Sequence, residues 1–271
     1  MKYMTFNSSC SYAALSNMLI NFGIDTTDRE IALKIKLPYM FDLKNDVFMS
    51  GPMLQSKEWF NLYVNPLGLK FVEAIVHKEL VPNYLRKTKT AMLGIKLDNG
   101  NKHAVVYQRN CGGHLFFLNN RRENDNIPDE ISFTDNELID RLDDLVTIGT
   151  LVKTQPIDVN IELKLESSII VLEKNLQAVK EISAISLTLD EIKGQLNTLF
   201  RPLFLDSIDM LKLIDEIDLA NGYKELQDEL MSVLRKNSNG SIKLQNYLSI
   251  NKLETLTNKY LNLIKNNKKS Q

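Results

Sequence analysis

The sequence has few of the residues that build disulfide scaffolds and metal centres. Its 271 residues include two cysteines, Cys10 and Cys111, and three histidines. Two thiols in a chain of this length are too few for a secreted disulfide framework, and they lack the clustered partners of a metal site. We therefore expect reduced thiols, no metal and no cofactor.

Long apolar runs and an excess of one charge are missing as well. No stretch approaches the roughly 18 apolar residues of a membrane span, and the first residues lack the apolar run of a signal peptide. The 33 basic and 34 acidic residues give a net charge of −1, without a basic stripe. We expect a cytoplasmic protein whose partners include neither nucleic acid nor a membrane.

The composition is that of a globular protein, with 44% hydrophobic and 25% charged residues. The sequence changes character near residue 155. Before that point, short strand-like runs alternate with helical ones, and after it the spacing is helical throughout. The pattern predicts an α+β fold. One domain would span residues 1–155, with a helix packed on an antiparallel sheet, and an all-α helical domain would span residues 156–271.

Individual elements follow from periodicity, caps and turn residues. In the first domain we expect helices at 11–22, 27–33, 53–63, 81–86 and 135–145, and strands at 71–76, 90–97, 103–107, 115–118 and 147–152. In the second we expect helices at 161–179, 189–200, 203–219, 223–236 and 242–265. Asp98–Asn101 predicts a hairpin turn, because Asn-Gly accepts positive φ angles.

Cys10 stands at the start of the first predicted helix, where Ser8 or Ser9 could serve as the cap. Amides and the helix dipole at this end stabilise an anion, and helix N-termini lower thiol pKa values. The amide of Cys10 would also face an oxyanion formed on an attacked carbonyl. These features indicate a nucleophile.

A thiol nucleophile needs a base, and His103 is the candidate because it opens a strand directly after the predicted hairpin turn. A three-residue loop at Cys111–Gly113 would set His103 opposite Arg121, with Asn119 diagonal to it on the same face. A two-residue loop would set Asn120 opposite His103. We favour Asn119 as the group that orients the imidazole, because three-residue loops prefer glycine at their last position.

These motifs resemble the papain-like fold. Cys10-Ser11-Tyr12-Ala13-Ala14-Leu15, followed by Phe22-Gly23-Ile24-Asp25, is similar to the double-glycine leader peptidases of bacterial bacteriocin exporters. The resemblance covers roughly residues 1–153 and implies Cys10, His103 and Asn119 as a triad. The sequence departs from that family in carrying Ser11 in place of glycine and Met4 in place of the oxyanion-hole glutamine, for which Asn7 or Ser8 could substitute.

We expect a cysteine-dependent hydrolase of peptide or amide bonds that works through an acyl-enzyme. Butirosin-type acyltransferases are also similar, so transfer of an acyl group from a carrier-protein thioester is a second hypothesis. The third is an inactive papain-like binding module, which the missing glutamine favours. We expect the helical domain to cover the cleft, form a homodimer or bind a partner protein.

Overall fold

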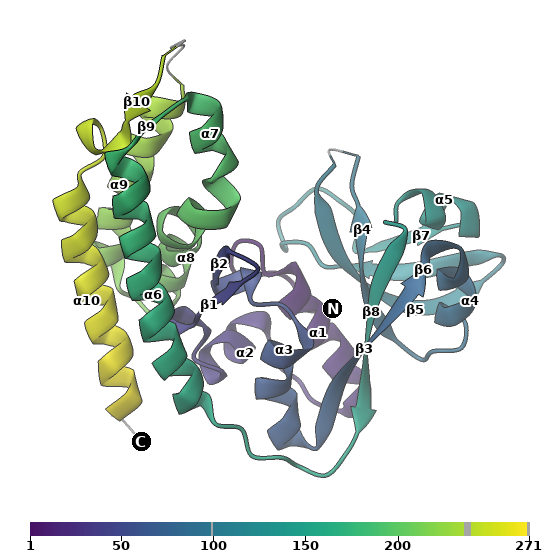
Figure 1. Cartoon of the computed structure of the whole chain (residues 1–271). Helices are drawn as coiled ribbons and strands as arrows, with labels where there is room; N and C mark the ends of the chain where they lie inside the picture. The colour runs from purple at the N-terminus through teal and green to yellow at the C-terminus, as the bar shows by residue number, and fades with distance from the viewer. Residues whose placement is uncertain (99, 236–239, 270–271) are drawn as a thin grey trace. The chain divides into compact units, whose positions relative to one another are not determined.

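The chain folds into two compact units (Figure 1). A computed structural model describes residues 1–98, 100–235 and 240–269. The sheet unit comprises Met1–Ile35 and Gln55–Val159, and the helical unit comprises Lys36–Leu54 together with the chain from Asn160 onward. The division after residue 159 lies four residues from the predicted boundary. Segment Lys36–Leu54, which the sequence analysis assigns to the first domain, packs with the helical unit instead.

The sheet unit is built on a six-stranded antiparallel sheet in the order β3-β8-β4-β5-β6-β7, which confirms the α+β class. Its strands are β3 (Leu69–His77), β4 (Ala91–Lys96), β5 (Lys102–Cys111), β6 (His114–Asn119), β7 (Glu130–Phe133) and β8 (Leu145–Lys153). Its helices are α1 (Cys10–Leu19), α2 (Asp28–Lys34), α3 (Lys57–Val64), α4 (Val81–Leu85) and α5 (Asp135–Asp140). Strand β7 was not predicted.

The local signals for the first two helices are confirmed. Helix α1 and a 3₁₀ turn at Ile20–Phe22 fill the predicted range, and Gly23 ends them with a φ of +76°. Thr27 caps α2 in a capping box with Glu30. At the predicted turn after β4, Gly100 has a φ of +79° and donates to Leu97, whereas Asn99 lies outside the described residues.

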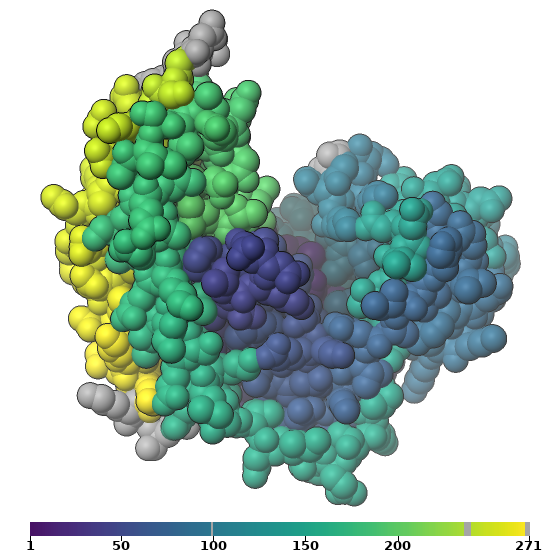
Figure 2. Space-filling view, in the orientation of Figure 1, coloured from purple at the N-terminus to yellow at the C-terminus, as the bar shows by residue number. Residues whose placement is uncertain are grey.

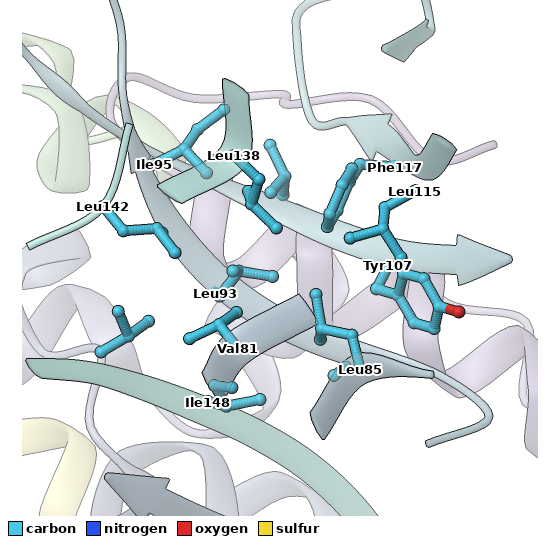
Figure 3. Packing of buried hydrophobic residues seen from close by; sticks show 13 residues of the cluster. Val81, Leu85, Leu93, Ile95, Tyr107, Leu115, Phe117, Leu138, Leu142 and Ile148 are labelled. Carbon is cyan, nitrogen blue, oxygen red and sulfur yellow. The ribbon is translucent and has the colours of Figure 1, made fainter. Parts of the chain in front are cut away.

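Buried side chains fill the space between the sheet and the short helices α4 and α5 (Figure 3). The cluster includes Leu93, Val105 and Phe117 from the sheet, Leu85 from α4 and Leu138 from α5, each at most 2% exposed. Burying a side chain of this kind stabilises a fold by about 1.5–3 kcal/mol. The other face of the sheet carries α1, nine of whose ten residues are buried.

The helical unit consists mainly of helices but is not all-α. Its helices are α6 (Ile161–Ala184), α7 (Leu189–Gly194), α8 (Ser207–Leu213), α9 (Ile217–Leu234) and α10 (Ile250–Lys269), and π-helical turns fill 196–200 and 202–206. It also contains β1 (Phe41–Lys44) paired with β2 (Val47–Ser50), and β9 (Ser186–Leu187) paired with β10 (Ile242–Lys243). The all-α prediction is therefore wrong, because two-residue strands leave no period in a sequence.

The β1–β2 hairpin belongs to this unit because its backbone bonds to the long helices. Asn45 and Asp46 have positive φ angles and form the two-residue turn. The amide of Phe41 donates to Ser168 Oγ of α6 over 2.9 Å, and the Tyr260 hydroxyl of α10 donates to the carbonyl of Pro38. In Figure 2 the hairpin is a dark patch lying against the green surface of the helices.

Helix α9 shows why one predicted boundary is wrong. Asn221-Gly222 was expected to separate two helices, yet both residues lie inside α9. A Cβ on Gly222 would come within 2.7 Å of Leu256 in α10. This glycine therefore permits close contact between two helices and does not end one. Among the described helices, none is long and apolar enough to cross a membrane.

We predict that Gly222→Ala destabilises the protein by about 1–3 kcal/mol, because the added methyl collides with Leu256. The matched control is Gly194→Ala in α7, where nothing lies within 4 Å of the added Cβ. That variant should be neutral or more stable by up to about 1 kcal/mol, since alanine favours helix. Urea unfolding measures both changes. Equal effects of the two substitutions would contradict the packing role of Gly222.

Candidate functional site

Cys10 is the first residue of α1, and its side chain is partly exposed. The expected serine cap is absent. Ser8 has a φ of +57°, and the Ser9 hydroxyl is directed to Asp28 Oδ2, 2.6 Å away, so it accepts from no helix amide. Within the described chain, the amides of Cys10 and Ser11 consequently have no acceptor. An uncapped helix start with free amides can stabilise negative charge beside the thiol.

Asp28 holds the chain that leads to Cys10. This carboxylate is fully buried at the first position of α2. It accepts from the amide of Thr5 at 2.8 Å, the hydroxyl of Thr5 at 2.7 Å, the hydroxyl of Ser9 and the amide of Arg29. The turn before Cys10 is thereby attached to α2, which fixes where α1 begins. Nothing in the local sequence distinguishes Asp28 from an ordinary first-turn acid of a capped helix.

Of the oxyanion candidates, Asn7 uses its side-chain oxygen to accept a hydrogen bond from Arg122. The sequence analysis missed a residue that contacts Ser11, the neighbour of Cys10 in the chain. The Ser11 hydroxyl donates to Gln55 Oε1 over 2.6 Å, and the Nε2 group of Gln55 has no partner among the described residues. Gln55 lies 45 positions further along the chain, so only the fold reveals that it is next to the start of α1.

The β5–β6 hairpin has a shorter loop than the predicted three-residue one. Near His103, however, its strands pair in the predicted register. Cys111 pairs with His114 across a two-residue loop, Gly112-Gly113, whose φ angles are +58° and +80°. An irregularity between Tyr107 and Arg109 then shifts the pairing by one residue. This bulge restores the predicted pairing beyond it.

Beyond the bulge, Val105 pairs with Asn119. His103 is two residues from Val105 on the same strand face, so Asn119 lies diagonal to it as expected. Burial lowers the pKa of His103, and a side-chain hydrogen bond with Asn119 acts in the opposite direction. The buried Nε2 atom of His103 nevertheless has no well-aligned hydrogen-bond partner within the described chain. We conclude that the imidazole and the Asn119 amide are close but not ideally aligned.

Asn120, the alternative orienting residue, performs a different task. It is fully buried, donates to the carbonyl of Ala104 at 2.9 Å and accepts from Asn17 Nδ2 at 2.9 Å. Asn17 in turn makes two hydrogen bonds with the main chain of Lys2. These side-chain amides connect the N-terminal segment, α1 and the sheet. Asn120 is therefore a structural link, and its oxygen is unavailable to His103.

The structure does not bring Cys10 and His103 into hydrogen-bonding contact. No hydrogen bond connects the thiol to either ring nitrogen within the described part of the chain. His103 pairs with Ile95, so its side chain starts from the face that carries the α4–α5 core, whereas α1 packs on the other face. The two groups can meet only if the imidazole turns over the end of β5, which begins at Lys102.

The remaining polar candidates are at the surface. His77 interacts with Glu79, His114 lies 3.2 Å from the carbonyl of Gly112, and Cys111 is an exposed free thiol. Both histidines are exposed. Among residues 1–98, 100–235 and 240–269, no group of three or more His, Cys, Asp or Glu side chains is arranged to hold a metal ion.

Comparison with protein-family models and with curated proteins finds no match for this chain.

We predict that Asp28→Ala destabilises the protein by about 2–3 kcal/mol, because buried donors on Thr5 and Ser9 lose their acceptor. Asp25→Ala is the control. Its carboxylate is 85% exposed and pairs with Lys2 at the surface, so the loss should stay below about 1 kcal/mol. Denaturant unfolding gives both values. A small effect at Asp28 would show that it does not anchor the turn.

We predict that the pKa of His103 lies below 6.5 and falls further in Asn119→Ala, because that substitution removes the interaction that favours the charged ring. An NMR titration of the ring protons measures the pKa in both proteins. Asn110→Ala changes an exposed residue of the same hairpin and should leave the titration of His103 unchanged. A pKa that rises in Asn119→Ala would rule out the favourable interaction.

Proposed function

We propose that the sheet unit is a papain-like thiol hydrolase of peptide or amide bonds, with Cys10 as the nucleophile. His103 takes the proton of the Cys10 thiol, and the resulting thiolate attacks the carbonyl carbon of the substrate and forms a C–S bond. The C–N bond then breaks, and the proton held on His103 moves to the leaving amine. Water, deprotonated by His103, attacks the thioester, so that the acid is released and the thiol is restored.

The observation that supports this proposal best is the open start of α1. Cys10 combines a partly exposed sulfur with helix amides that have no acceptor in the described chain. A developing oxyanion on the substrate would find the amide of Cys10 directly beside the attacking sulfur. The Asp28 network holds this geometry before substrate arrives, so little reorganisation is needed at the reaction step.

His103 and Asn119 fit the remaining roles of base and orienting group. A lowered pKa keeps the imidazole neutral near pH 7, and a neutral ring can accept a proton. Asn119 is itself anchored, because its Nδ2 group donates to the carbonyl of Pro128 over 3.0 Å. Catalytic hydrogen bonds are commonly long or misaligned without substrate. Contact with Cys10 requires the imidazole to turn over the end of β5, and we assign that turn to the substrate-bound state.

Gln55 would complete the oxyanion site. Its Oε1 atom accepts from Ser11, the residue after Cys10, and its Nε2 group remains available as a donor. A side-chain amide is the type of donor that supplements a backbone N–H at such a site. Under this proposal, Gln55 performs the role for which Asn7 and Ser8 were considered.

A second candidate function is an inactive binding module that keeps the fold without the chemistry. The missing hydrogen bond between Cys10 and His103 within the described chain favours it. In that case, the free amides at the start of α1 would bind a ligand without cleaving it.

We predict that iodoacetamide alkylates Cys10 and that His103→Ala slows the alkylation at pH 7 at least tenfold, because the thiol loses its base. Cys111 provides an internal control, since it is exposed and lies at the other end of β5 from His103. Peptide mapping by mass spectrometry gives both rates. Equal alkylation of Cys10 with and without His103 would refute the pair and leave the binding module.

Hydrolysis and acyl transfer can be distinguished by the substrate that reacts. Peptide amides and acyl thioesters of a carrier protein are each incubated with the full chain and with Cys10→Ala, and the intact mass is followed. An acyl adduct that appears only with the thioester and passes to an added amine would indicate an acyltransferase. Adduct and cleaved peptide from the amide substrates, both absent in Cys10→Ala, are the expected result.

A further inference from the structure

Strand β3 forms one edge of the six-stranded sheet, with β8 as its single neighbour in the sheet. The direction of its backbone groups can be determined from its bonds. The amide of Lys78 donates to Asp144 on the β8 side, and Phe71 uses both its amide and its carbonyl to bind the side chain of Asn61 on the other side. The amides and carbonyls of even-numbered residues of β3 therefore point toward β8. Those of odd-numbered residues point away from the sheet.

The outward-facing residues of β3 are covered only at its start. Asn61 occupies the backbone of Phe71, at 3.0 Å and 2.7 Å. The main-chain amides and carbonyls of Glu73, Ile75 and His77 have no hydrogen-bond partner among the described residues. Ile75 is also 72% exposed, the largest exposed fraction among the large hydrophobic residues of the described chain. An open strand edge with an exposed apolar residue is a template for pairing with another strand.

The order of residues along this edge is self-complementary. In an antiparallel pairing centred on Ile75, each copy sets Ile75 opposite Ile75 of the other, and Glu73 opposite His77 twice. All three positions carry outward-facing amides and carbonyls, so each opposed pair would exchange two hydrogen bonds. A carboxylate can accept a hydrogen bond from an imidazole N–H, and paired apolar side chains stabilise cross-strand contacts.

The side chains at the edge are compatible with this pairing. Glu73 uses one carboxylate oxygen, Oε1, to accept from the amide of Lys57 at 2.9 Å. His77 uses Nδ1 to contact Glu79, and its Nε2 atom has no partner in the described chain. The second oxygen of Glu73 and the Nε2 atom of His77 thus remain for the contact between copies. Asn61 stops the pairing at Phe71, which limits its length and register.

We propose that two copies of this chain associate through antiparallel pairing of β3, with Ile75 on the two-fold axis. This places two six-stranded sheets in one continuous twelve-stranded sheet. Three paired residues on each side bury little area, so the dimer is weak and depends on concentration. The proposal is independent of the thiol chemistry, and it uses the sheet unit, whereas the sequence analysis expected association through the helical domain.

Oligomeric state tests the proposal. Sedimentation of the full chain over a dilution series should show a monomer–dimer equilibrium that Ile75→Lys shifts at least tenfold toward monomer. The matched control is Thr147→Lys, which adds the same charge at an exposed residue opposite Ile75 on β8, away from the edge. Monomer at every concentration, or a dimer that Ile75→Lys leaves intact, would overturn the proposal; the second result would point to another surface such as the helical unit.

The register is tested by charge exchange. His77→Glu sets two carboxylates opposite each other and should weaken the dimer, whereas E73K/H77E sets a lysine opposite a glutamate and should recover it. Failure of the double variant to recover, with circular dichroism showing that it is folded, would rule out this register.

A cysteine at the axis gives a direct readout. Hydrogen-bonded antiparallel pairs place their Cα atoms about 5.5 Å apart, which a disulfide can span. In a background of Cys10→Ser and Cys111→Ser, mild oxidation of Ile75→Cys should give a covalent dimer. Thr147→Cys in the same background should stay monomeric. Crosslinking of both variants to the same extent would show random collision and would count against the pairing.

Discussion

The candidate site depends on one buried carboxylate. Asp28 gathers the backbone and hydroxyl of Thr5 and the hydroxyl of Ser9 around a fully buried side chain. Because a buried carboxylate is costly without such donors, the turn before Cys10 has one favourable arrangement. That arrangement draws Ser9 away from capping α1 and leaves the first amides of the helix free. A stabilising interaction in α2 thus determines the chemical character of the start of α1.

A second set of polar contacts orients α1 on the sheet. The buried face of α1 is mostly apolar. Asn17 is an exception, and its side-chain amide forms hydrogen bonds with Lys2, with the carbonyl of Ala13 in α1 and with Asn120. Buried amides of this kind specify an arrangement, since any other would leave them unsatisfied. The neighbouring residue Asn119 points to the opposite face, toward His103. Two consecutive asparagines therefore serve structure and candidate chemistry on opposite faces of one sheet.

A bulge, a glycine and one side-chain amide determine the local geometry of the sheet. The bulge between Tyr107 and Arg109 offsets the short Gly112-Gly113 loop, so that Asn119 reaches the vicinity of His103. At Gly149, a Cβ would come within 2.0 Å of Phe71, so glycine allows that ring to lie across β8. At the edge strand β3, Asn61 covers the backbone of Phe71, and the outward groups beyond it have no partner among the described residues.

Local signals in the sequence were sufficient for the α+β class, for α1 with its terminal Gly23 and for the capping box of α2. They also placed Cys10 at a helix start and His103 near Asn119, because strand alternation and helix caps act over a few residues. Tertiary structure alone decided that Lys36–Leu54 packs with the helical unit, that Gly222 lies inside α9 and that Gln55 approaches Ser11. It also decided that Cys10 and His103 do not bond in the described chain, since that separation depends on which face of the sheet each side chain leaves from. Contacts between distant segments arise from packing and burial, which no spacing along the chain encodes.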